Sequence, residues 1–128
     1  PQNYTFSAST NVTATSTTGY SQSASGNFSL NITGVDQVAT GRLDVAHNSD
    51  ATIMAGVGYG RAIYVRNLDD TNFVTVYNGA SSGADPIAVL EPGEFCFTVL
   101  RSTTTTVAKA DTATVTVEYF ALEIDTNA

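Results

Sequence analysis

The chain lacks most of the residue types on which enzyme, metal and nucleic-acid sites depend. It has one cysteine, one histidine, no tryptophan and only five basic residues among 128. One cysteine excludes an internal disulfide, and one cysteine with one histidine is too few for a zinc site. The scarcity of Lys and Arg removes the basic surface that phosphate contacts need. The composition therefore predicts no metal, no cofactor and no nucleic-acid partner.

Long apolar runs and charge are also scarce. No segment of the sequence approaches the roughly 18 apolar residues of a membrane span, and no signal-peptide pattern is visible. Charged residues make up 13% of the chain, and the formal net charge is −7. The polar surface must therefore come from Ser, Thr, Asn and Gly, as in TSTTG at 15–19 and STTTTV at 102–107. Thr is β-branched and stiff at χ1, so its abundance favours strands over helices.

Candidate catalytic groups are few and scattered. Cys96 lies between two phenylalanines, which predicts a packed core residue. A nucleophilic role would require His47, the lone histidine, as its base. Asp69 and Asp70 lack the ligand spacing of a calcium loop, and no serine lies in a nucleophile-elbow pattern. We therefore expect no catalysis and no metal site.

Apolar residues alternate with polar ones along most of the chain. Phe28, Leu30 and Ile32 fall at period two, and Gly34 is the expected end of that strand. Further short β runs follow, separated by turns about every 8–12 residues, and no useful window shows helical spacing. This pattern predicts about eight to ten strands in an antiparallel β-sandwich or jelly-roll-like fold. We expect that domain to span residues 27–128.

Two turns give the clearest local signals. Residues 62–65 and 73–77 flank an Asn- and Asp-rich turn, which predicts an antiparallel hairpin. In LEPGEFCF, Pro92 and Gly93 suit the centre of a type II turn, because proline fixes φ near about −65° and glycine tolerates positive φ. We expect this turn to hold the strands on either side of it in register as a second antiparallel pair.

Residues 1–26 are polar, low in charge and rich in Ser and Thr. Tyr4, Phe6 and Val12 alternate with polar neighbours. Such a segment has too little apolar surface to fold alone. We expect either weak edge strands or an extended arm that adds to a neighbouring sheet edge. The predicted subunit-contact residues of that arm are Tyr4, Phe6 and Val12.

A characteristic order of strands and turns runs through residues 61–123. It stands here as IYVRNLDDTNFVTVYNG, IAVLEPGEFCFTVLR, TVAKADTA and VTVEYFALEID. This pattern resembles a recurrent module of tailed-bacteriophage virion proteins. The resemblance implies a small structural protein of a capsid or tail, commonly a homotrimer, and it involves no catalytic motif. The N-terminal quarter of the chain lies outside it.

The resemblance and the composition lead to one main hypothesis and three alternatives. The main hypothesis is a capsid decoration (cement) protein that binds the major capsid protein on the outer shell and stabilises the lattice by mass action. It implies synthesis in the host cytoplasm and a place on the virion surface. The alternatives are a tail, head–tail junction or fibre-associated protein, an enzyme that gathers His47, Cys96 or two acids in a pocket, and a carbohydrate-binding β-sandwich. A carbohydrate-binding module would use exposed tyrosines, with the candidates being Tyr20, Tyr59, Tyr64 and Tyr77.

Overall fold

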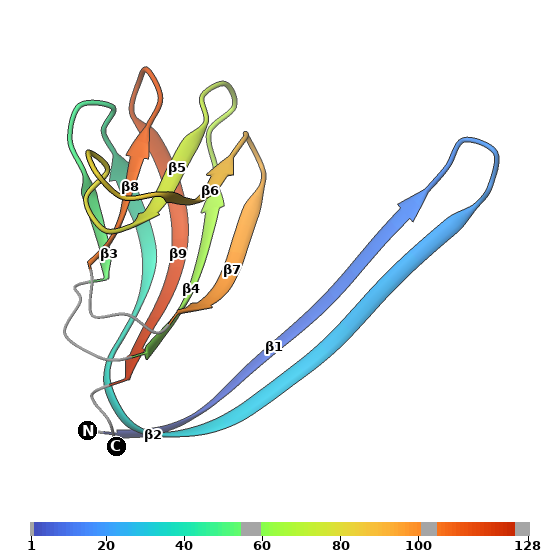
Figure 1. The fold of residues 1–128 in the computed structure, drawn as a ribbon, viewed down its shortest axis with the longest axis horizontal. Helices are drawn as coiled ribbons and strands as arrows, with labels where there is room; N and C mark the ends of the chain where they lie inside the picture. The colour runs from blue at the N-terminus through green and yellow to red at the C-terminus, as the bar shows by residue number, and fades with distance from the viewer. Residues whose placement is uncertain (1, 55–59, 101–104, 125–128) are drawn as a thin grey trace.

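The architecture comes from a computed structural model, which describes residues 2–54, 60–100 and 105–124. Throughout these residues the chain forms strands, turns and bends, without a helix (Figure 1). Nine strands follow one another along the described chain: β1 (Gln2–Thr15), β2 (Ser21–Val45), β3 (Ala51–Met54), β4 (Gly60–Asn67), β5 (Val74–Asn78), β6 (Pro86–Leu90), β7 (Phe95–Leu100), β8 (Thr106–Ala110) and β9 (Val115–Ile124).

The strands form two antiparallel sheets that pack face to face. One sheet has five strands in the order β1-β2-β9-β4-β7, and the other has four in the order β3-β8-β5-β6. This arrangement confirms the predicted all-β antiparallel sandwich. The jelly-roll connectivity stays a prediction.

The core lies between the inner faces of the two sheets. Alternation places every second residue of a strand on the inner face. Ile63 and Val65 of β4 are fully buried, as are Val74 and Val76 of β5. Short valine-rich strands can build this core because branched side chains fit a pleated surface.

The two predicted hairpins do not form. β4 pairs with β7 and β9, whereas β5 pairs with β6 and β8, so the turn between β4 and β5 carries the chain from one sheet to the other. The turn at Pro92 and Gly93 likewise joins β6 of the four-stranded sheet to β7 of the five-stranded sheet. Both predictions of strand pairing were wrong, because a tight turn between two β runs suits a sheet-to-sheet crossing as well as a hairpin.

The chemistry of the second turn agrees with the sequence. Gly93 has φ of 84°, and the N–H of Glu94 donates to the carbonyl of Glu91 at 3.0 Å. A positive φ at the third residue and a closing hydrogen bond are what a type II turn requires. The turn is therefore firm, although the two strands it joins belong to different sheets.

Buried Asn67 fastens both sheet-to-sheet crossings at one end of the sandwich. Its backbone accepts from the N–H of Gly93 at 3.0 Å and donates to the carbonyl of Glu94 at 2.9 Å. Its Nδ2 donates to the carbonyls of Asn72 and Leu90, each at 2.9 Å. Because a buried polar group without partners is costly, these bonds fix the two turns relative to each other.

β2 is a single strand of 25 residues that serves two parts of the molecule. It continues through Gly34, so the expected strand end there was wrong, and the expected domain border at 26/27 lies within it. Its first part pairs with β1 and its last part with β9, and both ladders meet Val35. The register with β9 shifts between Val35 and Gln37, as at a β-bulge, which bends a strand.

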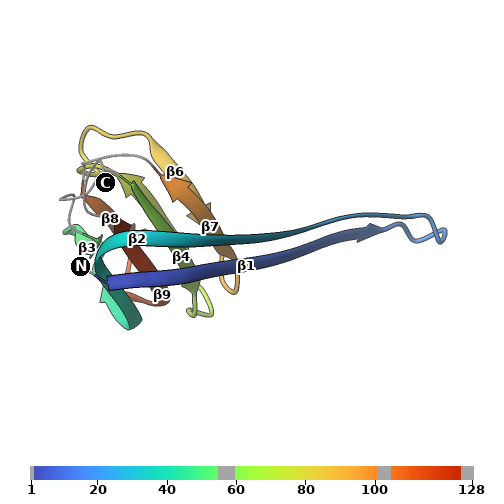
Figure 2. The ribbon, with the colours of Figure 1, turned by 90° about the horizontal axis from the view of Figure 1, so that it is seen from below.

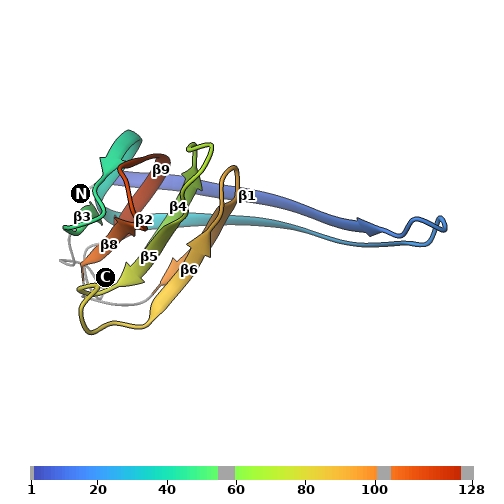
Figure 3. The same ribbon diagram turned by 90° about the horizontal axis from the view of Figure 1, so that it is seen from above.

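The molecule therefore consists of a sandwich with a long hairpin projecting from it. β1 and the first part of β2 leave the sandwich together and reach well beyond it (Figure 1). The two rotated views agree that the outer half of this hairpin has no other labelled strand beside it (Figure 2, Figure 3). We call the hairpin formed by residues 4–32 the arm.

Candidate functional site

The arm is one continuous antiparallel ladder. Residues 4–15 pair with residues 21–32 in unbroken register, which makes the ladder roughly 40 Å long. At the tip, the N–H of Ser16 donates to the carbonyl of Tyr20 at 2.7 Å, and the N–H of Gly19 donates to the carbonyl of Ser16 at 3.1 Å. Gly19 has φ of 95°, a conformation that glycine adopts without strain. The tip is thus a closed turn that holds Tyr20 81% exposed.

Strand alternation gives the arm two different faces. Even-numbered residues share one side, which we call the apolar face for Phe6, Ala8, Val12, Ala14, Ala24 and Phe28, with Thr10, Gln22 and Gly26 between them. Odd-numbered residues share the other side, which we call the hydroxyl face: Ser7, Ser9, Asn11, Thr13, Ser23, Ser25, Asn27 and Ser29. On the hydroxyl face, Ser9 donates to Asn27 Oδ1 at 2.8 Å. Neither face is charged, since the first charged residue of the chain is Asp36.

Phe6 anchors the base of the arm to the sandwich. Its ring stacks on Phe97 with centroids 5.8 Å apart, and it lies 6.2 Å from both Phe28 and Phe120. Phe6 is 8% exposed, whereas every residue from 9 to 29 is exposed. The arm is therefore held at its base, and its own chain leaves it uncovered beyond that point.

β4, β7 and β9 turn an aromatic surface toward the arm. Tyr64 pairs in register with Phe97 on one side and with Phe120 on the other. Its ring lies 5.8 Å from that of Phe95. On β7, which is an edge strand, Phe95, Phe97 and Val99 are 59%, 39% and 61% exposed, and we call these three side chains the outer face of β7. Exposed apolar clusters commonly mark contact surfaces.

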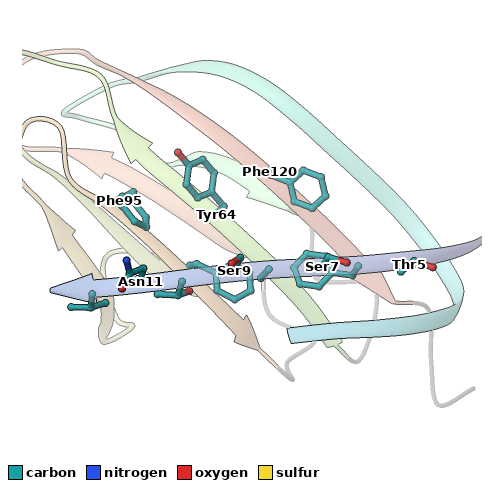
Figure 4. Close-up of a pocket in the computed structure, with 12 residues that line it drawn as sticks. Thr5, Ser7, Ser9, Asn11, Tyr64, Phe95 and Phe120 are labelled. Atoms are coloured by element: carbon teal, nitrogen blue, oxygen red, sulfur yellow. The ribbon is translucent and has the colours of Figure 1, made fainter. Parts of the chain in front are cut away.

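A groove of about 800 Å³ separates the arm from this surface (Figure 4). Residues 5–12 of β1 form one wall, and Tyr64, Phe95, Phe97 and Phe120 form the other. Figure 4 shows β1 running across the strands that carry these rings. Every described side chain that lines the groove is uncharged. The groove suits an apolar, uncharged occupant.

The structure brings two of the three predicted contact residues to this groove. Phe6 and Val12 both line it, and Phe6 is 8% exposed whereas Val12 is 61% exposed. The side chain of Tyr4 lies outside the described part of the chain. Sequence reasoning missed the second wall, to which β7 contributes Phe95 and Phe97. The signal was present in FCFTVL, a run without charge or proline, which are the usual protections of an edge strand.

The tyrosines that a sugar-binding module would use are spread over the molecule. Tyr20 is at the arm tip, Tyr64 lines the groove, and Tyr77 is in β5 of the other sheet. Tyr59 lies outside the described residues. The Tyr64 hydroxyl donates to Glu118 Oε1 at 3.3 Å. Only Tyr64 among the described tyrosines shares the groove with other aromatic rings.

Cys96 and His47 lie far apart. Cys96 faces the core from β7, and its burial raises the pKa of the thiol, which disfavours a thiolate. His47 is exposed and follows β2, which is three strands away from β7 in the same sheet, or roughly 14 Å. The two side chains therefore do not form a nucleophile–base pair.

Two carboxylates have lowered pKa values, and both stabilise turns. The hydroxyl and N–H of Ser81 donate to Asp50, which lowers its pKa. The N–H groups of Asn72 and Thr71 donate to Asp69 at 2.7 and 3.0 Å and lower its pKa in the same way. Among the described residues, no group of three or more His, Cys, Asp or Glu gathers as a metal site would.

Comparison of the chain with protein-family models, with curated proteins and with solved structures gives no match. Across the part of the chain that the structure describes, no helix is long and apolar enough to cross a membrane. Inference about function therefore rests on the arm, the groove and the chemistry of the residues that line them.

Proposed function

We propose that this chain is a bacteriophage capsid decoration (cement) protein, which binds the major capsid protein on the outer shell and stabilises the lattice without catalysis. The observation that carries the proposal is the arm, an uncharged amphipathic hairpin whose residues 9–29 are all exposed. An isolated two-stranded hairpin is marginally stable in water, so such an arm is suited to be covered by another protein. The proposal names a bacteriophage capsid because residues 61–123 resemble a module of tailed-bacteriophage virion proteins.

The physical role follows from mass action. A protein that binds the assembled lattice and not its separated subunits stabilises the lattice by its binding free energy. An arm roughly 40 Å long can contact a neighbouring subunit while the sandwich stays on its own site. The net charge of −7 suits an outer surface, where the chain does not meet packed nucleic acid. A homotrimer on the lattice is part of this proposal.

The proposal is tested by binding to purified capsids that lack the protein. We expect saturable co-sedimentation with assembled capsids, no binding to free capsid subunits, and a higher temperature of capsid disruption. A matched variant shortens the arm by joining Ser9 to Asn27 through Asn-Gly, because these residues face each other in the ladder and Asn-Gly favours a two-residue hairpin turn. We expect this short-arm variant to fold and to bind capsids weakly or not at all. Absence of saturable binding by the wild-type chain would refute the decoration role, and binding to tails instead would favour the tail alternative.

One observation favours the carbohydrate-binding alternative. Tyr64 lies beside Phe95 in a groove with polar residues of β1, and ligand sites commonly combine aromatic walls with a few polar groups. A glycan screen tests this directly: binding that disappears in Tyr64→Ala and persists in Tyr77→Ala would support it. Equal effects of the two variants would remove the support.

A further inference from the structure

We propose that a second copy of this chain occupies the groove, with its outer face of β7 packed against the apolar face of the arm. Each copy would then contact one neighbour through the apolar face of its arm and another neighbour through the outer face of its β7. The contact is between identical chains, so it does not depend on which particle the protein joins.

The outer part of the arm has no second layer packed against its apolar face. Phe6 and Ala8 of the apolar face pack on the sandwich, but Val12 is 61% and Phe28 is 45% exposed. Alternating strands with one apolar face are typical of a sheet that covers another apolar layer. Apolar residues continue along this face to Val12, Ala14 and Ala24, although Thr10, Gln22 and Gly26 interrupt them, and the chain supplies the second layer only at the base. Something outside the chain is therefore needed to cover the outer part.

Each copy also carries an exposed apolar surface that matches the apolar face of the arm. Phe95 and Val99 of β7 remain largely exposed, even though Phe6 of the same chain covers part of Phe97. Phe95 and Phe97 line the groove together with the arm, and Val99 lies on the same face of β7 by strand alternation. An arm on one copy and a β7 face on the next make a head-to-tail contact, which closes into a ring or continues as a chain.

The arm and the described lining of the groove are also free of charged side chains. Two copies with a net charge of −7 repel each other. The contact proposed here avoids that cost, because the arm and the described lining of the groove carry no charged side chain. Ionic screening over about 8 Å at physiological salt further separates the contact from the charges of the domain. A charged partner such as nucleic acid would find no complementary group in the groove.

The size of the contact predicts modest affinity. The seven residue pairs from Ser9↔Asn27 to Thr15↔Ser21 give the uncovered face a length of about 24 Å and an area of about 230 Å². Even when the surface of both copies is counted, covering this face buries far less than the roughly 1,200 Å² of a typical stable interface. In a ring each copy makes two such contacts, and we therefore expect association that depends on protein concentration.

Mixed single-cysteine variants test the contact itself. The native thiol is removed by Cys96→Ala, and one preparation carries Val12→Cys while a second, with a larger tag, carries Val99→Cys. Mild oxidation of the mixture is expected to give the mixed disulfide dimer, which contact within one chain cannot produce. Thr13→Cys is the matched control, because it places the thiol on the hydroxyl face at the adjacent position. Absence of the mixed dimer, or an equal yield with Thr13→Cys, would overturn the proposal.

The solution mass tests the same contact between copies without introduced cysteines. Val12→Asp places a charge on the apolar face at an exposed position, and burial of an unpaired charge is expected to weaken association by about tenfold or more. Thr13→Asp makes the same change on the hydroxyl face and is expected to keep the wild-type mass by light scattering. Equal masses of the two variants would count against the contact. A wild-type mass of 13.4 kDa at every concentration would also overturn it, and would leave the groove to a different apolar partner.

Discussion

At the scale of single residues, side-chain hydrogen bonds hold the turns at one end of the sandwich. Asn67 is the main example, because it is fully buried and bonds to both turns at one end of the sandwich. Its role could not be derived from the sequence, since asparagine in RNLDD is equally typical of a solvated turn. Only the sheet-to-sheet crossing explains why the side chain is buried.

Asn67→Ala is expected to lower the free energy of unfolding by about 3 kcal/mol, because the carbonyls of Asn72 and Leu90 lose their donor. The measurement is urea denaturation followed by circular dichroism. Asn48→Ala, at an exposed position, is the control and is expected to change the value by about 0.5 kcal/mol or less. Similar effects of the two substitutions would show that Asn67 does not hold the turns.

The hydrogen-bonded carboxylate of Asp69 is expected to make the folded chain less stable in acid. Its pKa is lower in the folded chain than the unfolded value of about 3.9. The stabilisation is therefore fully present above pH 4 or so and is lost as the pH falls toward the folded pKa. Asp69→Asn is expected to lower the melting temperature at pH 7. Below about pH 4, the melting temperature of the variant is expected to fall less with pH than that of the wild type.

Asp70→Asn provides the control for that series, since it removes the same charge from the adjacent exposed residue. Thermal melts from pH 7 to pH 2 compare the three proteins. An Asp69→Asn curve parallel to that of Asp70→Asn would contradict the assigned hydrogen bonds.

At the scale of elements, the strands could be predicted from the sequence but their partners could not. The apolar runs at 62–65 and 73–77 located β4 and β5 to within about two residues at each end. The turns after Asn67 and Leu90 gave no sign of which sheet the next strand joins. Gly34 was a misleading signal as well, since β2 continues through it. Sheet membership is decided by packing between distant strands, which local turn chemistry does not encode.

The turn at Gly93 was predicted correctly, and its strain can be tested. Gly93→Ala is expected to cost about 1–2 kcal/mol, because φ of 84° is unfavourable for a residue with a Cβ. The added Cβ would meet no atom within 4 Å, so packing contributes nothing. Gly83→Ala has equally open space without a positive φ and is expected to be neutral or slightly stabilising. Equal unfolding free energies for the two variants would contradict the turn geometry.

At the scale of the whole molecule, the arm and the outer face of β7 are the two surfaces of the proposed contact between copies. The sequence allowed the arm to be expected from its Ser- and Thr-rich composition, and Phe6 and Val12 to be selected from it. The groove could not be predicted, because β1 and β7 are the opposite edge strands of one sheet. To line the same groove, β1 must cross the outer face of that sheet toward β7. This crossing depends on the bend of β2, which no local residue pattern indicated.

The most direct test of assembly through the arm is the solution mass of the wild-type chain and of the short-arm variant, by size exclusion with light scattering over a range of concentrations. We expect the wild-type mass to rise with concentration to a multiple of 13.4 kDa and the short-arm variant to stay at the mass of one chain. Unchanged thermal stability of the variant at low concentration would show that its sandwich remains folded. Equal oligomeric states of the two proteins would contradict assembly through the arm.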